Sequence, residues 1–136
     1  MTGFYLGLDL GDVRTGIAKS DPLGILATPL KTIPAGTLLD ELKQLVSSDC
    51  KGLVIGMPFN LKGQAEQKAK FVETVITSIR GEFPDLPIVT LDERFTSRIA
   101  QQQILASGRG KKARQEKGLV DRQAAAIILQ DYLNSK

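Results

Sequence analysis

The 136-residue sequence contains no histidine, and this absence excludes several common kinds of active site. Hydrolases that activate serine or cysteine with a histidine base need a residue that the chain lacks, and so does a histidine zinc site. The single cysteine, Cys50, cannot form an internal disulfide, which favours a reducing compartment. No apolar stretch approaches the roughly 18 residues of a membrane span, and the first residues lack a signal-peptide pattern. The sequence therefore predicts a cytoplasmic protein without membrane contact, built as one domain over residues 1–136.

Basic residues are scarce in most of the chain and concentrated in one stretch. Residues 1–93 hold 9 basic and 12 acidic side chains, whereas residues 94–117 hold 7 basic side chains and 1 acidic one. Residues 118–136 are balanced, with 2 of each. Clustered lysine and arginine favour a polyanionic partner such as nucleic acid, although a solvated loop would have the same composition.

The N-terminal quarter of the chain has the alternation of apolar and other residues that is typical of strands. Residues 3–10 and 14–20 are two such segments, and a third lies near 25–33. Only short turns separate them, beginning with Gly11–Asp12. Because neighbouring strands joined by short turns run antiparallel, the sequence predicts an antiparallel meander.

The rest of the chain alternates between helical and strand-like segments. The spacing of apolar residues predicts strands at 52–56 and 87–91, and helices at about 38–46, 64–80, 96–106 and 119–133. The glycine- and lysine-rich segment 107–118 is predicted to be mobile. This order predicts an α/β fold with a five-stranded mixed sheet, three antiparallel strands followed by two parallel ones, flanked by helices.

Three carboxylates stand at the ends of these predicted elements. Asp9 lies in an apolar strand, where burial of an uncompensated carboxylate is costly, so we expect an arginine, N–H groups, a metal or a turn beside it. Glu93 follows the fifth predicted strand and either faces the ligand-binding edge of the sheet or pairs with a nearby arginine. Asp121 opens the last predicted helix, as an N-cap or as a metal ligand.

Separated carboxylates, no histidine and a basic flank together favour metal-dependent hydrolysis of phosphodiester bonds. Hard divalent cations take oxygen ligands, and two of them about 4 Å apart can activate water and stabilise the leaving oxygen. The candidate catalytic and metal-binding residues are Asp9, Glu93 and Asp121. The candidate nucleic-acid-binding residues are Arg14, Arg94, Arg98, Arg109, Lys111, Lys112 and Arg114.

Four segments, in order and at fitting spacing, resemble the YqgF/RuvX family. They are the opening motif at 7–18, the central loop at 56–63, the Asp-Glu-Arg-Phe-Thr-Ser segment at 92–97 and the C-terminal motif at 120–129. The resemblance covers nearly the whole chain. Each motif alone is weak, but the four together are specific.

The resemblance implies an RNase H-like fold and a nuclease that uses Mg²⁺ or Mn²⁺. Family members are named as Holliday junction resolvases and as nucleases that mature the 5′ end of precursor 16S rRNA. The family's acidic residues correspond to Asp9, Glu93 and Asp121. Bacterial junction resolvases of this fold tend to carry a further carboxylate where this chain has Ala124, so the second metal is expected to bind only with substrate.

The first hypothesis is an endonuclease acting on structured RNA. Its substrate would be precursor 16S rRNA, free or within a ribosomal precursor particle, and the protein would be a monomer or a weak homodimer. The second is a Holliday junction resolvase acting on branched DNA, which must be a stable dimer because it cuts two strands symmetrically. The third is a nucleic-acid-binding factor without catalysis, whose binding would ignore divalent metal. A phosphate-binding half of an actin-like ATPase is disfavoured because the chain is too short for the second half.

Overall fold

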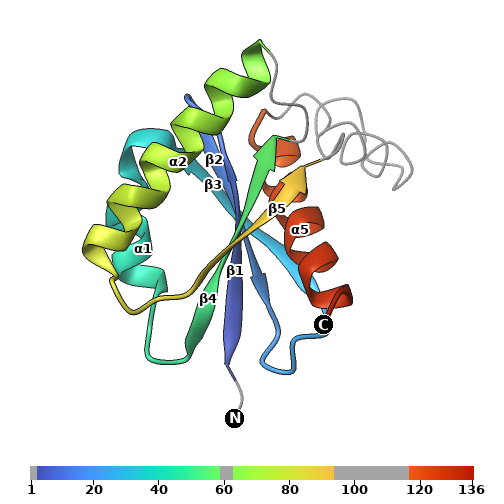
Figure 1. Ribbon diagram of the computed structural model, residues 1–136. Coiled ribbons are helices and arrows are strands. Elements are labelled where there is room, and N and C mark those ends of the chain that lie inside the picture. Colours follow the sequence, from blue (N-terminus) through green and yellow to red (C-terminus); the bar gives the residue numbers. More distant parts are fainter. Residues whose placement is uncertain (1–2, 59–62, 94–116) are drawn as a thin grey trace.

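A five-stranded sheet in the order β3-β2-β1-β4-β5 forms the centre of the computed structural model, which describes residues 3–58, 63–93 and 117–136 (Figure 1). The strands are β1 (Phe4–Leu10), β2 (Arg14–Ser20), β3 (Ala27–Pro34), β4 (Cys50–Pro58) and β5 (Ile88–Glu93). The helices are the short 3-10 turn η1 (Ala35–Thr37), α1 (Leu38–Leu45), α2 (Gln64–Glu82) and α5 (Lys117–Asn134).

The pairing of the strands follows from the lengths of their connections. β1 with β2 and β2 with β3 are antiparallel pairs, and only three residues connect β1 to β2. β1 with β4 and β4 with β5 are parallel pairs, each reached through a helical crossover. The predicted mixed sheet, three antiparallel strands followed by two parallel ones, is therefore confirmed.

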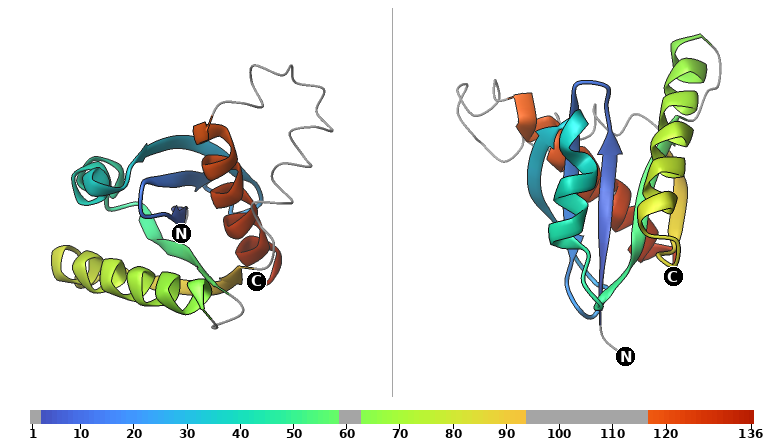
Figure 2. Two further views of the ribbon diagram at one scale, coloured as in Figure 1. Left: turned by 90° about the horizontal axis from the view of Figure 1, so that it is seen from above. Right: turned by 90° about the vertical axis from the view of Figure 1, so that its left-hand side faces the viewer.

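Helices cover both faces of this sheet (Figure 2). α1 and α2 pack on one face, and α5 packs on the other. β4 is buried on both of its faces. Leu53 and Ile55 face the α1–α2 core, and Val54 between them faces α5. A strand covered on both faces needs an unbroken apolar run, as its sequence predicts.

Two glycines let α5 lie directly against the sheet. A Cβ at Gly7 of β1 would come within 2.7 Å of the Leu129 Cβ, and one at Gly16 of β2 within 2.0 Å of the Asp121 backbone oxygen. Both separations are shorter than real Cβ contacts. The two glycines therefore determine how closely α5 packs on the sheet. Gly16 does so near the start of the helix, and Gly7 does so in its second half.

Some predicted boundaries differ from those of the structure. α5 begins at Lys117, so Asp121 is its fifth residue, and the interpretation of Asp121 as an N-cap is wrong. β5 continues through Glu93 instead of ending at residue 91. The predicted helix 96–106 and most of the predicted mobile segment 107–118 lie outside the described residues. Residue propensities could not locate the start of α5 or the end of β5, because tertiary packing decides how far a terminal turn or strand continues.

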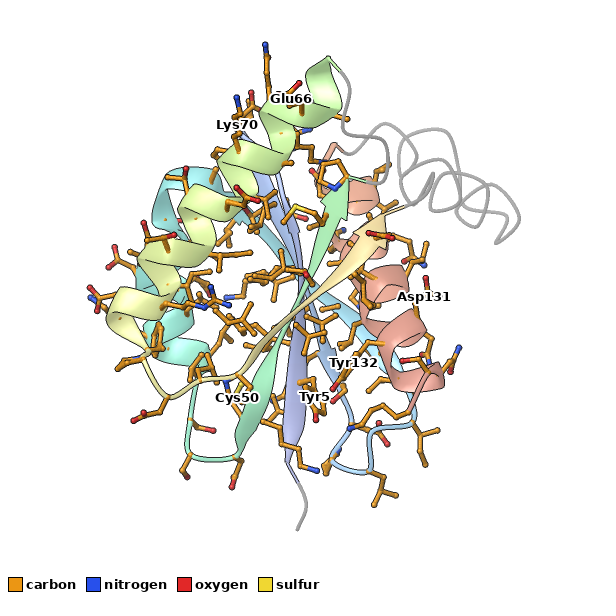
Figure 3. The ribbon with its side chains drawn as sticks, viewed as in Figure 1. Tyr5, Cys50, Glu66, Lys70, Asp131 and Tyr132 are labelled. Atoms are coloured by element: carbon orange, nitrogen blue, oxygen red, sulfur yellow. The ribbon has the colours of Figure 1, made fainter. Side chains whose placement is uncertain are left out.

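The end of the sheet where β1 begins is held by an aromatic pair (Figure 3). The rings of Tyr5 and Tyr132 meet edge to face with their centroids 5.2 Å apart. Lys136 Nζ lies 4.4 Å from the Tyr5 ring centroid and donates a 3.0 Å hydrogen bond to the Tyr5 hydroxyl, which lowers the pKa of Tyr5. These contacts tie the end of α5 to β1. Among the described helices, none is long and apolar enough to cross a membrane.

Candidate active site

Asp9 is a nearly buried carboxylate at the end of the central strand. It is 8% exposed and lies two residues before the first turn of the chain, opposite Gly16 of β2. Residues two apart on a strand, and residues directly paired across an antiparallel ladder, share a face. Asp9 therefore belongs with Gly7 and Gly16 to the face that α5 covers.

Asp121 reaches this place from the opposite end of the chain. The backbone of α5 at Asp121 rests on Gly16, the residue that pairs with Asp9. Its carboxylate accepts a hydrogen bond from the Arg14 guanidinium, with 2.7 Å between Nε and Oδ2. The structure thus brings Asp9 and Asp121, two of the three predicted catalytic carboxylates, to the same point of the sheet.

The ion pair between Arg14 and Asp121 joins residues 107 positions apart in the chain. The Arg14 side chain is 39% exposed and that of Asp121 22% exposed, so the pair contributes at most about 1 kcal/mol to stability. Its main effect is geometric, because a guanidinium hydrogen bond restrains the direction of the carboxylate. Arg14, a predicted phosphate ligand, thus lies beside the predicted metal ligand Asp121, at the rim of the same site.

Glu93 is the last residue of β5, and its backbone pairs with Pro58 of β4. β1, β4 and β5 are parallel, so Leu10, Pro58 and Glu93 mark the same edge of the sheet. This is the edge where ligands gather in open α/β sheets. The backbone of Glu93 therefore lies at the predicted ligand-binding edge of the sheet. Its side chain lies outside the described part of the structure.

The donor set fits a hard divalent cation. Asp9 and Asp121 offer only carboxylate oxygens, the ligands that Mg²⁺ and Mn²⁺ prefer. Within residues 3–58, 63–93 and 117–136, no three acidic or sulfur-bearing side chains form a metal-binding group. Two of the predicted ligands, Asp9 and Asp121, stand on backbone segments that neighbour Gly16, and the third predicted ligand is Glu93.

A cavity of about 420 Å³ is lined in part by two arginines that neighbour Asp121, one through its ion pair and one in the chain. Arg14 and Arg122 line it, together with Val13, Thr32, Ile33, Pro34 and Gly118. The Arg122 guanidinium lies close to Gly118, because a Cβ there would stand 3.3 Å from its terminal nitrogen. Two guanidinium groups at one cavity form a suitable place for a phosphate group.

Arg122 is a functional candidate that reasoning from the sequence missed. The count of charges is balanced over residues 118–136, which directed attention away from it. The available signal was its position immediately after Asp121, on a helix predicted to carry a metal ligand. The predicted phosphate ligands in the basic stretch, Arg94, Arg98, Arg109, Lys111, Lys112 and Arg114, lie outside the described residues.

Comparison with known sequences gives matches over nearly the whole chain. A family model described as "RuvX: Holliday junction resolvase" matches residues 3–135. The chain is 44% identical over 132 residues to a protein of Flavobacterium johnsoniae and 41% identical over 134 residues to one of Porphyromonas gingivalis. Both are named "Putative pre-16S rRNA nuclease". The alignments cover 96% and 98% of this chain, and 96% and 97% of the two relatives.

Two solved structures share the fold at low sequence identity. "T. thermophilus RuvC in complex with Holliday junction substrate" aligns with a TM-score of 0.60 and 15% identity, covering 98% of this chain and 94% of that one. The fowlpox virus resolvase, in complex with Holliday junction DNA, aligns with a TM-score of 0.62 and 11% identity, covering 97% of both chains. At these identities the likeness concerns the fold alone, and it confirms the predicted RNase H-like architecture.

Proposed function

Because the chain belongs to the RuvX family, which makes it a nuclease that hydrolyses phosphodiester bonds, we propose that it is a metal-dependent endonuclease of structured RNA. The proposed reaction is maturation of the 5′ end of precursor 16S rRNA, carried out by a single domain spanning residues 1–136. The observation that supports the proposed site is that Gly16 neighbours both candidates, as the strand partner of Asp9 and as the residue on which the Asp121 backbone rests. The choice of RNA rests on relatives of 38–44% identity that are named for this substrate.

In this proposal Asp9, Glu93 and Asp121 hold Mg²⁺ or Mn²⁺. When bound, such ions activate water and stabilise the leaving oxygen, which removes the need for a histidine base. The near burial of Asp9 keeps its oxygens from being freely hydrated, so their negative charge acts strongly on an entering cation. Arg14 holds the Asp121 carboxylate in place at the exposed rim before metal and substrate arrive.

The substrate phosphates would be held by basic side chains on both sides of the carboxylates. Arg14 and Arg122 line one cavity beside Asp121, which supports a phosphate site there. The basic stretch would extend this contact along the RNA through Arg94, Arg98, Arg109, Lys111, Lys112 and Arg114. The proposed site has few acidic ligands, because the position one helical turn after Asp121 is an alanine. This residue, Ala124, is fully buried and its side chain offers no oxygen ligand.

The second candidate is a Holliday junction resolvase in DNA recombination or repair. The description of the matching family model favours it. A resolvase cuts two symmetry-related strands, so it requires a stable dimer with two such sites. A monomer or weak homodimer at micromolar concentration, measured by sedimentation, would favour the RNA nuclease, whereas a stable dimer would favour the resolvase.

The central test is Asp9→Asn, assayed on a 5′-extended precursor 16S rRNA fragment and on a four-way DNA junction. We expect Mg²⁺- or Mn²⁺-dependent cutting of the RNA by the wild type and a loss of about 100-fold or more in the variant, because a metal ligand is removed. Asp131→Asn is the matched control, since Asp131 is an exposed carboxylate farther along α5 (Figure 3). This control is expected to cut at the wild-type rate.

Three results would contradict the proposal in different ways. Cutting by Asp9→Asn at the wild-type rate would remove Asp9 from the metal site. Selective cutting of the junction would replace the RNA substrate with branched DNA. Tight binding in EDTA without cutting of either substrate would point to a nucleic-acid-binding factor.

A further inference from the structure

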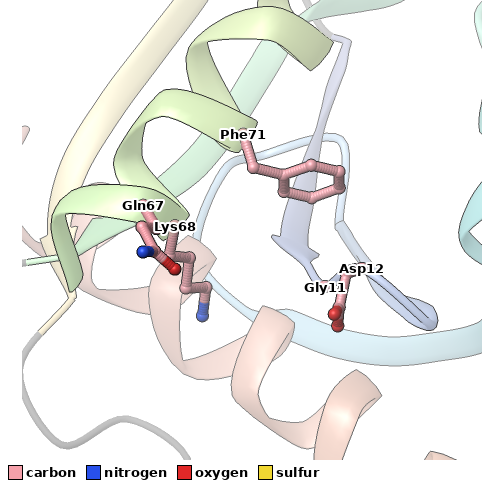
Figure 4. A pocket seen from close by; sticks show the side chains of 5 residues that line it. All are labelled: Gly11, Asp12, Gln67, Lys68 and Phe71. Carbon is pink, nitrogen blue, oxygen red and sulfur yellow. The ribbon is translucent and has the colours of Figure 1, made fainter. Parts of the chain in front are cut away.

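A second cavity, of about 360 Å³, opens at the same end of the sheet as Asp9 (Figure 4). Its lining residues are Gly11, Asp12, Gln67, Lys68 and Phe71, and we call it the Phe71 pocket. The turn after β1 forms one wall, and the first turns of α2 form the other. Gly11 follows Asp9 by two residues, so their backbones are at most about 7 Å apart.

The lining of the Phe71 pocket combines one aromatic ring with polar groups of several kinds. Gln67 and Phe71 are four residues apart on α2 and so are neighbours on one face of the helix. Figure 4 shows the Phe71 ring on the side of α2 that faces the Gly11–Asp12 turn. Asp12 supplies a carboxylate, Gln67 an amide and Lys68 an ammonium group.

Phe71 is only partly buried, although it packs against the core formed by α1, α2 and the sheet. Val72 and Ile79, by contrast, are core residues of this helix and have no exposed surface. The ring at position 71 thus borders both the core and an open cavity. An aromatic face at a cavity, with hydrogen-bonding groups around it, is the arrangement that proteins use to stack and contact an unpaired base.

We propose that the Phe71 pocket receives an unstacked nucleobase of the strand that is cut at the Asp9 site. The inference rests on the proposed nuclease function and adds a requirement to it: the nucleotide near the scissile phosphate is unpaired. The base stacks on Phe71, while Gln67 and Asp12 contact its edge and Lys68 lies near the sugar–phosphate backbone. Structured RNA with a single-stranded segment at the cleavage position is the substrate class that this pocket fits.

The test is the affinity of the full chain for a single-stranded RNA that carries 2-aminopurine, a fluorescent base, at one position at a time. All measurements are made in EDTA, so binding is read without cleavage. We expect one position at which the fluorescence changes on binding, because the base leaves its neighbours in the strand, and at which an abasic nucleotide weakens binding by about 10-fold. Tenfold corresponds to about 1.4 kcal/mol, which lies within the range typical of one base–aromatic stack.

Two variants separate stacking from a packing effect. Phe71→Leu removes the aromatic ring but keeps an apolar side chain against the core, and it is expected to lose both the fluorescence change and the abasic effect. Phe83→Leu is the matched control, because Phe83 is also a partly buried phenylalanine against the same core, at the other end of α2. This control, and Phe71→Trp, should keep both signals.

Several outcomes would overturn the proposal. One is the absence of any position whose fluorescence changes on binding to the wild type, and another is an unchanged abasic effect in Phe71→Leu. Equal losses in Phe71→Leu and Phe83→Leu would assign the effect to packing. None of these depends on cleavage, so a nuclease without the base pocket and a base pocket without nuclease activity give different results.

Discussion

Gly16→Ala adds one methyl group where the backbone of α5 meets the sheet beside both catalytic candidates. The new Cβ would stand 2.0 Å from the Asp121 backbone oxygen, whereas ordinary contacts lie at 3.4–4 Å. The nearest atoms all belong to the backbone of Asp121 and Arg122, so they cannot rotate out of the way as a side chain could. α5 must therefore move away from β2 by about 1 Å or more, and it carries Asp121 with it.

The magnitude follows from two opposing effects. Replacing glycine by alanine within a strand ordinarily stabilises by about 0.5–1 kcal/mol, whereas overpacking a core costs about 1–3 kcal/mol. We expect a net loss of about 1–2 kcal/mol in the free energy of unfolding, measured by urea denaturation. A displacement of about 1 Å in a catalytic group can cost about 100-fold in rate, so the expected loss of cleavage is much larger than the loss of stability.

Gly7→Ala supplies the comparison, because it overpacks the same helix elsewhere. Its Cβ would stand 2.7 Å from the Leu129 Cβ and 2.8 Å from the Ala125 backbone oxygen, away from Asp121. We expect a similar loss of stability with a smaller loss of cleavage. Equal losses of cleavage in both variants, or wild-type cleavage by Gly16→Ala, would refute the assignment of the site to the contact between Gly16 and Asp121.

Two further predictions concern charge. The Asp21 carboxylate accepts hydrogen bonds from the N–H groups of Leu26, at 2.9 Å, and Ile25, at 2.7 Å, and these lower the pKa of Asp21. A lowered folded-state pKa stabilises above the unfolded pKa, about 3.9, and this stability disappears as the pH falls through the folded value. Asp21→Asn should thus be less stable than the wild type at pH 7 and should converge with it near pH 2 in urea denaturation; a constant difference would contradict this cause. Replacing Lys111, Lys112 and Arg114 by alanine should reduce the salt dependence of RNA binding by about 1 in slope for each lost phosphate contact, and an unchanged slope would show that the stretch is only solvated.

The order of the elements and the sheet type could be predicted because both depend on short-range patterns. The alternation in β1 and β2 and the short turn at Gly11–Asp12 specify an antiparallel pair without reference to the rest of the chain. The apolar run of β4 likewise indicates a strand covered on both faces. The ends of α5 could not be predicted in the same way, because its first turn packs against β3 through Thr32, whose hydroxyl donates to the Gly118 carbonyl.

By itself, the sequence determined the chemical possibilities of the protein: carboxylates without histidine, one basic stretch and four motifs of one nuclease family. Only the tertiary structure decided that the Asp121 backbone rests on Gly16, the partner of Asp9 in the sheet, and that Arg14 binds Asp121. It also decided that the Phe71 pocket opens at the same end of the sheet. The physical reason is the distance along the chain over which each kind of interaction acts. Periodicity and turn chemistry act over a few residues, whereas a contact between residues 107 apart depends on how one helix is seated on a sheet. That seating depends on Gly7 and Gly16, whose close contacts with α5 exist only in the folded chain.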